Sequence, residues 1–257
     1  MKNNSAIKTL EQIKGIRKAC ILASKTLDFA ASLVEPMIST EFLNKELDKF
    51  IRSHGGIPAP LNYRGYPKSI CTSVNDVVCH GIPSETCILK KGDILNIDVT
   101  VILDGYFGDS SRMFYVGSIE EVNLEARKLV EASEMAMYEG ISAVREGAYL
   151  NDIGIAIESF LARNCFRYGI VREYTGHGTG LAFHEWPQVY HFNSGSTGPK
   201  LEEGMVFTIE PMINQGTWKT KLDSDGWTVR TADGGLSAQW EHTVLVRKHG
   251  VEILTYS

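Results

Sequence analysis

The sequence has no cluster of basic residues. Its formal net charge is −5, and its 26 Lys and Arg residues are outnumbered by 31 Asp and Glu residues. Nucleic acid and anionic membranes attract proteins through concentrated positive charge, so neither is expected as a direct ligand. The sequence also lacks any apolar run approaching the roughly 18 residues of a membrane-spanning helix, and its charged beginning lacks the apolar core of a secretory signal peptide.

Cysteine is scarce and forms no recognisable framework. The five cysteines are odd in number and include no CxxC pair: Cys20, Cys71, Cys79, Cys87 and Cys165. This usage is typical of reduced thiols and excludes a structural zinc module built on cysteine pairs. We therefore expect a cytoplasmic protein.

The length and composition are those of an ordinary globular protein. The 257 residues, 43% of them apolar, suffice for one large core or two fused halves. No segment has the composition of a linker, so residues 1–257 are expected to form a single domain. No exposed apolar stripe is evident, and a monomer is expected.

Periodicity and turn residues predict the main elements. Apolar residues at helical spacing predict helices over residues 11–33, 40–54, 119–138 and 150–164. A segment rich in Gly, Pro and Tyr, GGIPAPLNYRGYPKS, predicts an ordered loop. Two β-rich runs flank Asp104 and Gly105 and predict a hairpin with a two-residue turn.

The order of these elements suggests an internal duplication. Two helices followed by strands occur twice, and LKKGDILNID (89–98) aligns without a gap with LEEGMVFTIE (201–210) at an offset of 112 residues. We predict pseudosymmetric halves over about 1–118 and 119–257. The predicted fold class is α+β, a curved antiparallel sheet with helices packed on its outer face.

Two aspartates of the predicted hairpin point to a shared ligand. Asp98 lies in NIDVTVI, a strand apolar enough to be buried, where an ionised carboxylate needs a positive partner. A two-residue turn at 104–105 places Asp98 opposite Ser111. Asp109 then lies on the same face and diagonal to Asp98, about 7–8 Å away, so the two carboxylates can converge on a cation. The alternative is two ordinary aspartates, one in a turn and one that caps a helix N-terminus or is bonded to hydroxyl groups.

Glu210 and Glu241 are two further carboxylates in apolar strands, within VFTIEPM and AQWEHTVLV. A single carboxylate of this kind is more often paired with Arg or Lys, but no matching set of basic residues lies in these strands, and like charges repel unless cations separate them. His177 lies between glycines in YTGHGTG and adds an imidazole, although a lone histidine is usually structural. Such ligands favour Mn, Fe(II), Co or Zn, and four carboxylates suit two ions about 3.5–4 Å apart.

These residues lie in motifs that match a known family. The motifs are NIDVTV, DGYFGDSSRMF, GHGTGLAFHEWPQV, FTIEPM and SAQWEHT, with YRGYPKS and VNDVVCHGIP in the first half. Together with the ordered set Asp98, Asp109, His177, Glu210 and Glu241, they resemble the methionine aminopeptidases of the short bacterial type I form, which lacks an N-terminal zinc-binding extension. The resemblance spans nearly the whole chain and implies the pita-bread fold and two divalent metal ions.

The resemblance also implies a function and a set of roles. The function is removal of the initiator methionine from the N-termini of nascent proteins by two-metal hydrolysis, with a small second residue preferred. His80, His184 and Glu210 would be catalytic: the histidines would contact the substrate or the tetrahedral intermediate, and Glu210 would shuttle a proton. Transient association with the ribosome fits this biology, although no basic patch supports it.

Two further sites follow from the same resemblance. The methionine side chain would lie in a pocket formed by Tyr63, Tyr66, Cys71, His80, Phe183, His184 and Trp227. Aromatic and sulfur surfaces suit a flexible thioether, although without the resemblance these residues would be taken as ordinary core. A monovalent cation would bind at Asn75, Val77 and Ser237.

Thr179, Thr175 and Pro60 depart from the usual residues of the family. These departures put fine specificity in question and leave open a paralogue specialised for an unusual N-terminus. A prolidase or aminopeptidase P generally carries an extra N-terminal domain. A non-catalytic binding module or a metal-free, creatinase-like hydrolase would lack some of the five ligands.

Overall fold

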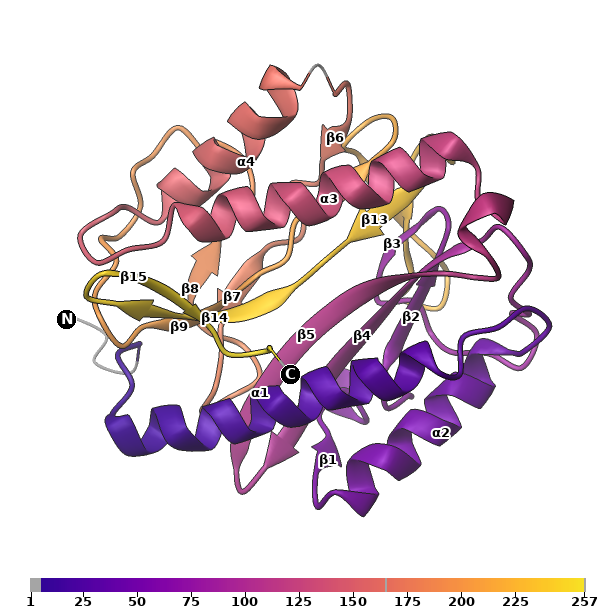
Figure 1. Ribbon diagram of the computed structural model, residues 1–257, viewed down its shortest axis with the longest axis horizontal. Helices are drawn as coiled ribbons and strands as arrows, with labels where there is room; N and C mark the ends of the chain where they lie inside the picture. The colour runs from indigo at the N-terminus through magenta and orange to yellow at the C-terminus, as the bar shows by residue number, and fades with distance from the viewer. Residues whose placement is uncertain (1–5, 165, 257) are drawn as a thin grey trace.

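The computed structural model describes residues 6–164 and 166–256. In these ranges the chain forms two pairs of α-helices, each pair followed by strands (Figure 1). The helices are α1 (Leu10–Ala31), α2 (Thr40–Ser53), α3 (Leu124–Ser142) and α4 (Asn151–Arg163). No helix within the described ranges has the length and apolar character needed to cross a membrane.

Local side-chain bonds fix where α1, α2 and α3 begin. The Thr9 hydroxyl accepts the backbone N–H of Gln12 in a capping box at the start of α1, and Ser39 caps α2 in a similar way. The predicted helix over 119–138 is wrong at its start. Ile119–Glu121 form a separate 3₁₀ turn, and α3 begins later because the Asn123 side chain accepts the N–H of Glu125.

The strands pair only in antiparallel fashion within the described ranges. In the first part of the chain they are β1 (Ile57–Pro58), β2 (Cys71–Val74), β3 (Val77–Cys79), β4 (Ile94–Leu103) and β5 (Tyr106–Tyr115). The later strands are β6 (Gly169–Ile170), β7 (Gly176–Gly178), β8 (Glu185–Val189), β9 (Val206–Ile209), β10 (Met212–Asn214), β11 (Thr220–Leu222), β12 (Val229–Thr231), β13 (Ser237–Gln239), β14 (His242–Arg247) and β15 (Gly250–Ile253).

The β4–β5 hairpin has the predicted register. Leu103 pairs with Tyr106 across a two-residue turn, in which both residues have positive φ as the tight hairpin turn requires. Asp98 therefore pairs with Ser111, and Asp109 pairs with Thr100, two positions along β4. Both aspartates lie on one face of the hairpin, as predicted.

Hydrogen bonding divides the predicted sheet into four smaller groups. The largest are β1-β4-β2 with β5 beside β4, and β15-β14-β9-β7-β8. The break between β9 and β10 falls at Glu210 and Pro211, since proline has no N–H for the ladder. An isolated bridge between Ser111 and Glu241 links β5 to the segment that precedes β14. This bridge joins the two largest groups at the centre of the molecule.

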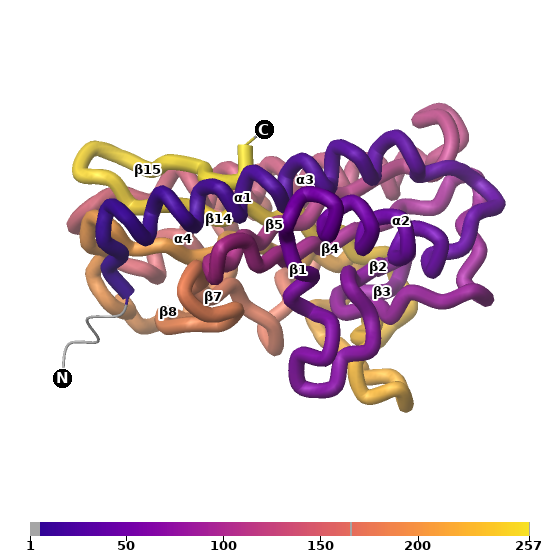
Figure 2. Tube along the Cα trace, turned by 90° about the horizontal axis from the view of Figure 1, so that it is seen from below, coloured from indigo at the N-terminus to yellow at the C-terminus, as the bar shows by residue number. Residues whose placement is uncertain are grey.

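The helices cover one side of the strands. In Figure 2 α1, α2 and α3 run along one side, and β7, β8, β2 and β3 lie beneath them. One buried cluster packs α1 and α2 on β4, with Leu43, Leu47 and Ile97 fully buried; another packs α3 and α4 on β9, β10 and β14. The repeated order agrees with the predicted duplication, and the division into halves at about residue 118 stays a prediction.

Gly108 provides a test of this packing, because α1 passes directly over it. A Cβ atom at Gly108 would lie 2.3 Å from backbone atoms of Ala19 and Cys20, which cannot move as a side chain can. We expect Gly108→Ala to lower the free energy of unfolding by about 1–3 kcal/mol, measured by urea denaturation. Gly235→Ala is the control, since its Cβ would meet nothing closer than 3.3 Å. Equal stability of the two variants would contradict this account.

Candidate metal centre and its cavity

A cavity of about 280 Å³ lies among the ends of the central strands, away from the helices. None of the residues that line it, in the described part of the chain, belongs to α1–α4. Its lining combines acidic, imidazole and aromatic groups: Pro60, Tyr63, Arg64, Tyr66, Cys71, His80, Asp98, Thr100, Asp109, Glu173, Tyr174, Thr175, His177, Phe183, His184, Glu210, Met212, Trp227 and Glu241.

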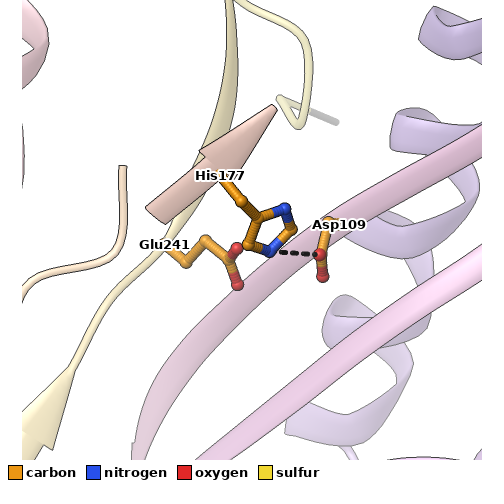
Figure 3. Close-up of side chains that lie close together, drawn as sticks. All are labelled: Asp109, His177 and Glu241. Carbon is orange, nitrogen blue, oxygen red and sulfur yellow. Dashed lines mark ion pairs between the residues drawn. The ribbon is translucent and has the colours of Figure 1, made fainter. Parts of the chain in front are cut away.

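The five predicted metal ligands all line this cavity: Asp98, Asp109, His177, Glu210 and Glu241. Figure 3 shows Asp109 on β5, His177 on β7 and Glu241 before β14 pointing toward one another. One ligand atom from each of these three lies within 4.8 Å of the others. The His177 Nε2 atom is also 3.6 Å from both Asp109 Oδ2 and Glu210 Oε1, too far for a strong hydrogen bond.

The position of the proton on the His177 ring determines how its Nε2 atom interacts with these two carboxylates. Its Nδ1 atom lies 3.0 Å from the Gly178 carbonyl oxygen, which can only accept a hydrogen bond, so Nδ1 carries the proton. Burial lowers the His177 pKa to about 4, so the ring is neutral at pH 7. The lone pair of Nε2 therefore faces two carboxylates, an arrangement that repels unless a cation lies between them.

The four carboxyl groups also repel one another in their charged forms. Burial raises the pKa of Asp98 to about 7. Burial, followed by repulsion from neighbouring carboxylates, holds the pKa values of Asp109, Glu210 and Glu241 well above their usual range. No Lys or Arg in residues 6–164 and 166–256 forms an ion pair with any of the four. Buried oxygens without a basic partner, together with one neutral imidazole, fit divalent metal ions.

Hydrogen bonds from neighbouring side chains orient these carboxylates. The Thr100 hydroxyl donates to Asp109 Oδ1 at 2.6 Å, and the Thr208 hydroxyl donates to Glu210 Oε1 at 2.7 Å. Gln239 Nε2 donates to Glu210 Oε2 at 3.2 Å. Groups that surround the ligands of a metal site commonly fix them in this way.

His80 and His184 both line the cavity and come from different segments of the chain. His80 has a φ of 55°, an unfavourable value for a residue with a side chain, and such strain is common at functional sites. Burial lowers the pKa of His80 to about 4, and burial together with His177 lowers that of His184 to about 3. Both rings are therefore neutral at pH 7. His184 Nδ1 lies 3.0 Å from the Tyr63 hydroxyl, so the ring has a defined partner.

The predicted methionine pocket residues also line the cavity. The rings of Tyr63 and Phe183 are 4.8 Å apart, and those of Tyr66 and Trp227 meet edge to face at 5.2 Å. Cys71 on β2 pairs directly with Asp98 on β4, which sets the pocket against the carboxylates. The structure brings all seven predicted residues to one cavity, and their role as a methionine pocket stays a prediction.

Helix α2 holds the loop that carries the two pocket tyrosines. Lys68 forms an ion pair of 2.6 Å with the buried Glu41. The Ser69 N–H donates to Asn44 Oδ1 at 3.0 Å, and the Ser69 hydroxyl donates to Asp48 Oδ1 at 2.7 Å. This loop is therefore ordered by bonds to a helix, as its composition predicted.

Several residues of the site were not found from the sequence. Arg64, Glu173, Tyr174 and Met212 line the cavity. His191 lies behind the ligands and is fully buried, and its Nε2 accepts the backbone N–H of Glu210 at 3.0 Å. Its place between the aromatic residues Tyr190 and Phe192 was the available sequence signal. Thr208 was easier to find, because a residue two positions before Glu210 lies on the same face of the strand.

The three departures from the family pattern lie in different places. Pro60 and Thr175 line the cavity, whereas Thr179 does not. Thr179 is fully buried, and its hydroxyl donates to the Ala182 carbonyl oxygen at 3.4 Å. An aliphatic residue could not make this bond.

The residues predicted for a monovalent cation lie close together. The Ser237 N–H donates to the Asn75 carbonyl oxygen at 2.9 Å, and Val77 follows on β3. The Asn75 amide donates to Asp93 at 2.8 Å, and the Ser237 hydroxyl donates to Asn214 at 2.8 Å. The cation site itself stays a prediction.

Comparison with known proteins identifies the family of this chain. Residues 14–248 match the model of metallopeptidase family M24. A methionine aminopeptidase of Rickettsia prowazekii is 53% identical over 243 residues, which cover 94% of this chain and 92% of that protein. Methionine aminopeptidase A of Synechocystis is 50% identical over 244 residues, covering 95% and 94% of the two chains.

Solved structures agree with the sequence comparison. The methionine aminopeptidase of Rickettsia prowazekii superposes with a TM-score of 0.93 at 52% identity, covering 97% of this chain and 99% of that one. The Thermotoga maritima enzyme gives a TM-score of 0.93 at 31% identity, covering 98% and 99%. A prolidase from Pyrococcus furiosus shares only the fold, with a TM-score of 0.76 at 23% identity over 66% of its chain. These neighbours confirm the predicted α+β, pita-bread fold.

The raised carboxyl pKa values predict how the metal-free protein responds to pH. Groups whose pKa is raised by folding stabilise the folded state at low pH and lose that contribution as the pH rises through the raised values. The buried histidines have lowered pKa values, so their effect on the pH dependence of the free energy of unfolding is confined to pH values below about 6.5. Between about pH 6.5 and 8.5 we therefore expect the free energy of unfolding of chelator-treated protein to fall by on the order of 1 kcal/mol per pH unit.

Urea denaturation with chelator and with Mn²⁺ over this pH range makes the measurement. Added Mn²⁺ is expected to remove most of the slope, because the cation replaces the protons that the carboxylates would otherwise need. Asp109→Asn is expected to reduce the slope without metal. An identical slope with chelator and with Mn²⁺ would show that the cluster does not bind the ion.

Proposed function

Because the chain belongs to metallopeptidase family M24, and to the methionine aminopeptidases within it, we propose that its cavity removes the initiator methionine from nascent proteins through the five-residue centre. The enzyme is a metal-dependent exopeptidase. The observation that supports this use of the cavity is the lone pair of His177, which faces two buried carboxylates beside an aromatic pocket.

Asp98, Asp109, His177, Glu210 and Glu241 would hold two divalent ions, drawn from Mn, Fe(II), Co or Zn. Four carboxylates offer eight oxygens in one buried cluster, more than a single ion of this class uses together with an imidazole. Bound there, divalent ions lower the pKa of water and polarise a carbonyl group. A monovalent cation at Asn75, Val77 and Ser237 belongs to the same proposal.

Glu210 is placed to move the proton in hydrolysis. Thr208 and Gln239 donate hydrogen bonds to its two oxygens and hold the carboxylate in place beside the other predicted ligands. We infer that Glu210 accepts a proton from the attacking water and returns it to the nitrogen of the leaving peptide.

The two neutral histidines contact the substrate in this proposal. If the Tyr63 hydroxyl donates to His184 Nδ1, the Nε2–H of His184 is free to donate to the carbonyl oxygen of the scissile bond as negative charge develops on it. His80, on another wall of the cavity, contacts the scissile amide. Both rings are uncharged at neutral pH, so neither repels the substrate's N-terminal ammonium group.

The remaining pocket selects the first residue. The methionine side chain would lie among Tyr63, Tyr66, Cys71, Phe183 and Trp227. Such a lining favours a flexible thioether. The preference for a small second residue is part of the proposal and rests on the family resemblance alone.

The cellular setting is part of the proposal. Cys20, Cys71, Cys79 and Cys87 are free thiols, which agrees with the reducing cytoplasm, and Cys165 lies outside the described residues. A monomer that associates transiently with the ribosome fits a substrate that is a nascent N-terminus.

An activity assay tests the reaction. Metal-stripped protein would be supplied with Mn²⁺, Fe²⁺, Co²⁺ or Zn²⁺ and given Met-Gly-Met-Met. We expect metal-dependent release of free Met, and a loss of about 100-fold or more in Asp98→Asn, because the centre loses a charged ligand. Glu125→Gln, which changes an exposed carboxylate, is the control. Release from Xaa-Pro or Ala-Ala-Ser peptides instead of Met peptides would favour a relative with another specificity.

The number of ions is a separate question. Equilibrium dialysis of the wild-type protein against Mn²⁺, followed by elemental analysis, is expected to give two ions per chain. Asp98→Asn is expected to bind at least one of them more weakly. A plateau at one ion per chain up to millimolar Mn²⁺ would rule out the two-ion centre while leaving a one-ion hydrolase.

A further inference from the structure

The loop between β7 and β8 carries two side chains into the cavity. It leaves β7 at Gly178 and returns at Glu185, and these two residues pair with each other. Phe183 and His184 come from the loop, and their rings lie 4.4 Å apart. Within the loop the backbone itself supplies few bonds, among them Gly180 N–H to the Ala182 carbonyl oxygen at 3.3 Å. Something else must hold the two rings in place.

The side chain of Glu185 closes this loop. Its Oε1 atom accepts the backbone N–H of Leu181 at 2.6 Å and that of Ala182 at 2.9 Å. Two amides that bond to one ionised carboxylate make stronger hydrogen bonds than neutral partners would. The carboxylate thus spans the residues immediately before Phe183 and His184 and ties them to the strand that follows.

The second oxygen of Glu185 meets a lysine from the beginning of the chain. Lys8 Nζ forms an ion pair with Oε2, and the two side chains are only 1% and 10% exposed. Lys8 is itself anchored, because its N–H donates to the Gly204 carbonyl oxygen at 2.9 Å and the adjacent Ile7 pairs with Met205. A buried carboxylate that lost this lysine would be left with an uncompensated charge.

We propose that Glu185 is a positioning residue for His184 and Phe183, and that Lys8 holds the Glu185 carboxylate in its loop-closing orientation. The inference rests on the proposed function, because it assigns Glu185 an effect on hydrolysis through those two rings. Glu185 does not line the cavity and so acts on the substrate only through the loop. A shift of about 1 Å in catalytic groups can cost about 100-fold in rate.

Three variants separate the charge from the hydrogen bonds. Glu185→Ala removes the acceptor of both amides, and we expect kcat for Met-Ala-Ser with Mn²⁺ to fall by about 100-fold, with a smaller rise in KM. Lys8→Met leaves the carboxylate buried and unpaired. The double variant Lys8→Met, Glu185→Gln removes both charges but keeps an amide oxygen for Leu181 and Ala182, and we expect it to recover kcat to within about 10-fold of wild type.

Two further measurements distinguish positioning from general stabilisation. Hydrogen exchange of the Leu181 and Ala182 amides is expected to accelerate in Glu185→Ala and to return toward wild type in the double variant. The imidazole NMR signals of His184 are expected to shift in Glu185→Ala and to recover in the double variant. Glu125→Ala, which breaks an exposed ion pair with Lys128, is the control for loss of a charge pair alone.

The outcomes are decisive in either direction. If Glu185→Ala lowers the melting temperature but keeps wild-type kcat and KM, the residue is structural and the proposal is overturned. If Glu185→Ala does not fold, the double variant carries the test, and wild-type kcat with altered loop exchange in that variant overturns it. If the wild-type protein itself releases no Met with any metal, the proposed function fails. The His184 signals then decide the positioning role alone: unchanged signals in the variants refute it.

Discussion

Mutual repulsion among four carboxylates, three of them buried and Asp98 half-buried, is the constraint on which the rest of this structure depends. Asp98, Asp109, Glu210 and Glu241 converge without a basic partner in the described part of the chain, and the one imidazole among them presents a lone pair. Such a cluster is tolerable only with protons or cations inside it. The hydroxyl and amide donors around it fix the directions of its oxygens but add no positive charge. The fold therefore keeps a costly centre that bound metal ions relieve.

The strands are arranged to bring this centre together and not to form one continuous ladder. Glu210 lies at the break before Pro211, and Glu241 lies between β13 and β14. Strand pairing is interrupted where these two predicted ligands turn toward the cavity, and the bridge from Ser111 to Glu241 reconnects the groups there. Meanwhile the helices pack on the other side, where Gly108 lets α1 approach β5 closely. The helices thus pack on one side of the strands, and the cavity with its charged groups lies on the other.

Much of this was predictable from the sequence, because it depends on local rules. The register that places Asp98 and Asp109 on one face follows from the two-residue turn alone, and most helix ends follow from caps and periodicity. The start of α3 was mispredicted because a capping box and an N-cap lie five residues apart, and both suit a helix start. Contacts between segments far apart in the chain have no local sequence signal that would predict them. Lys8 and Glu185 are separated by 177 residues, and the His191 ring accepts the backbone N–H of Glu210 from 19 residues away.

The bridge between Ser111 and Glu241 also orders events during synthesis of the protein. Translation delivers the two aspartates of the hairpin first and Glu241 last, after His177 and Glu210. A partly made chain carries the hairpin carboxylates, but the sheet edge that closes the centre is still missing. The predicted metal centre is therefore complete only when Glu241 docks on β5, at a late step of synthesis.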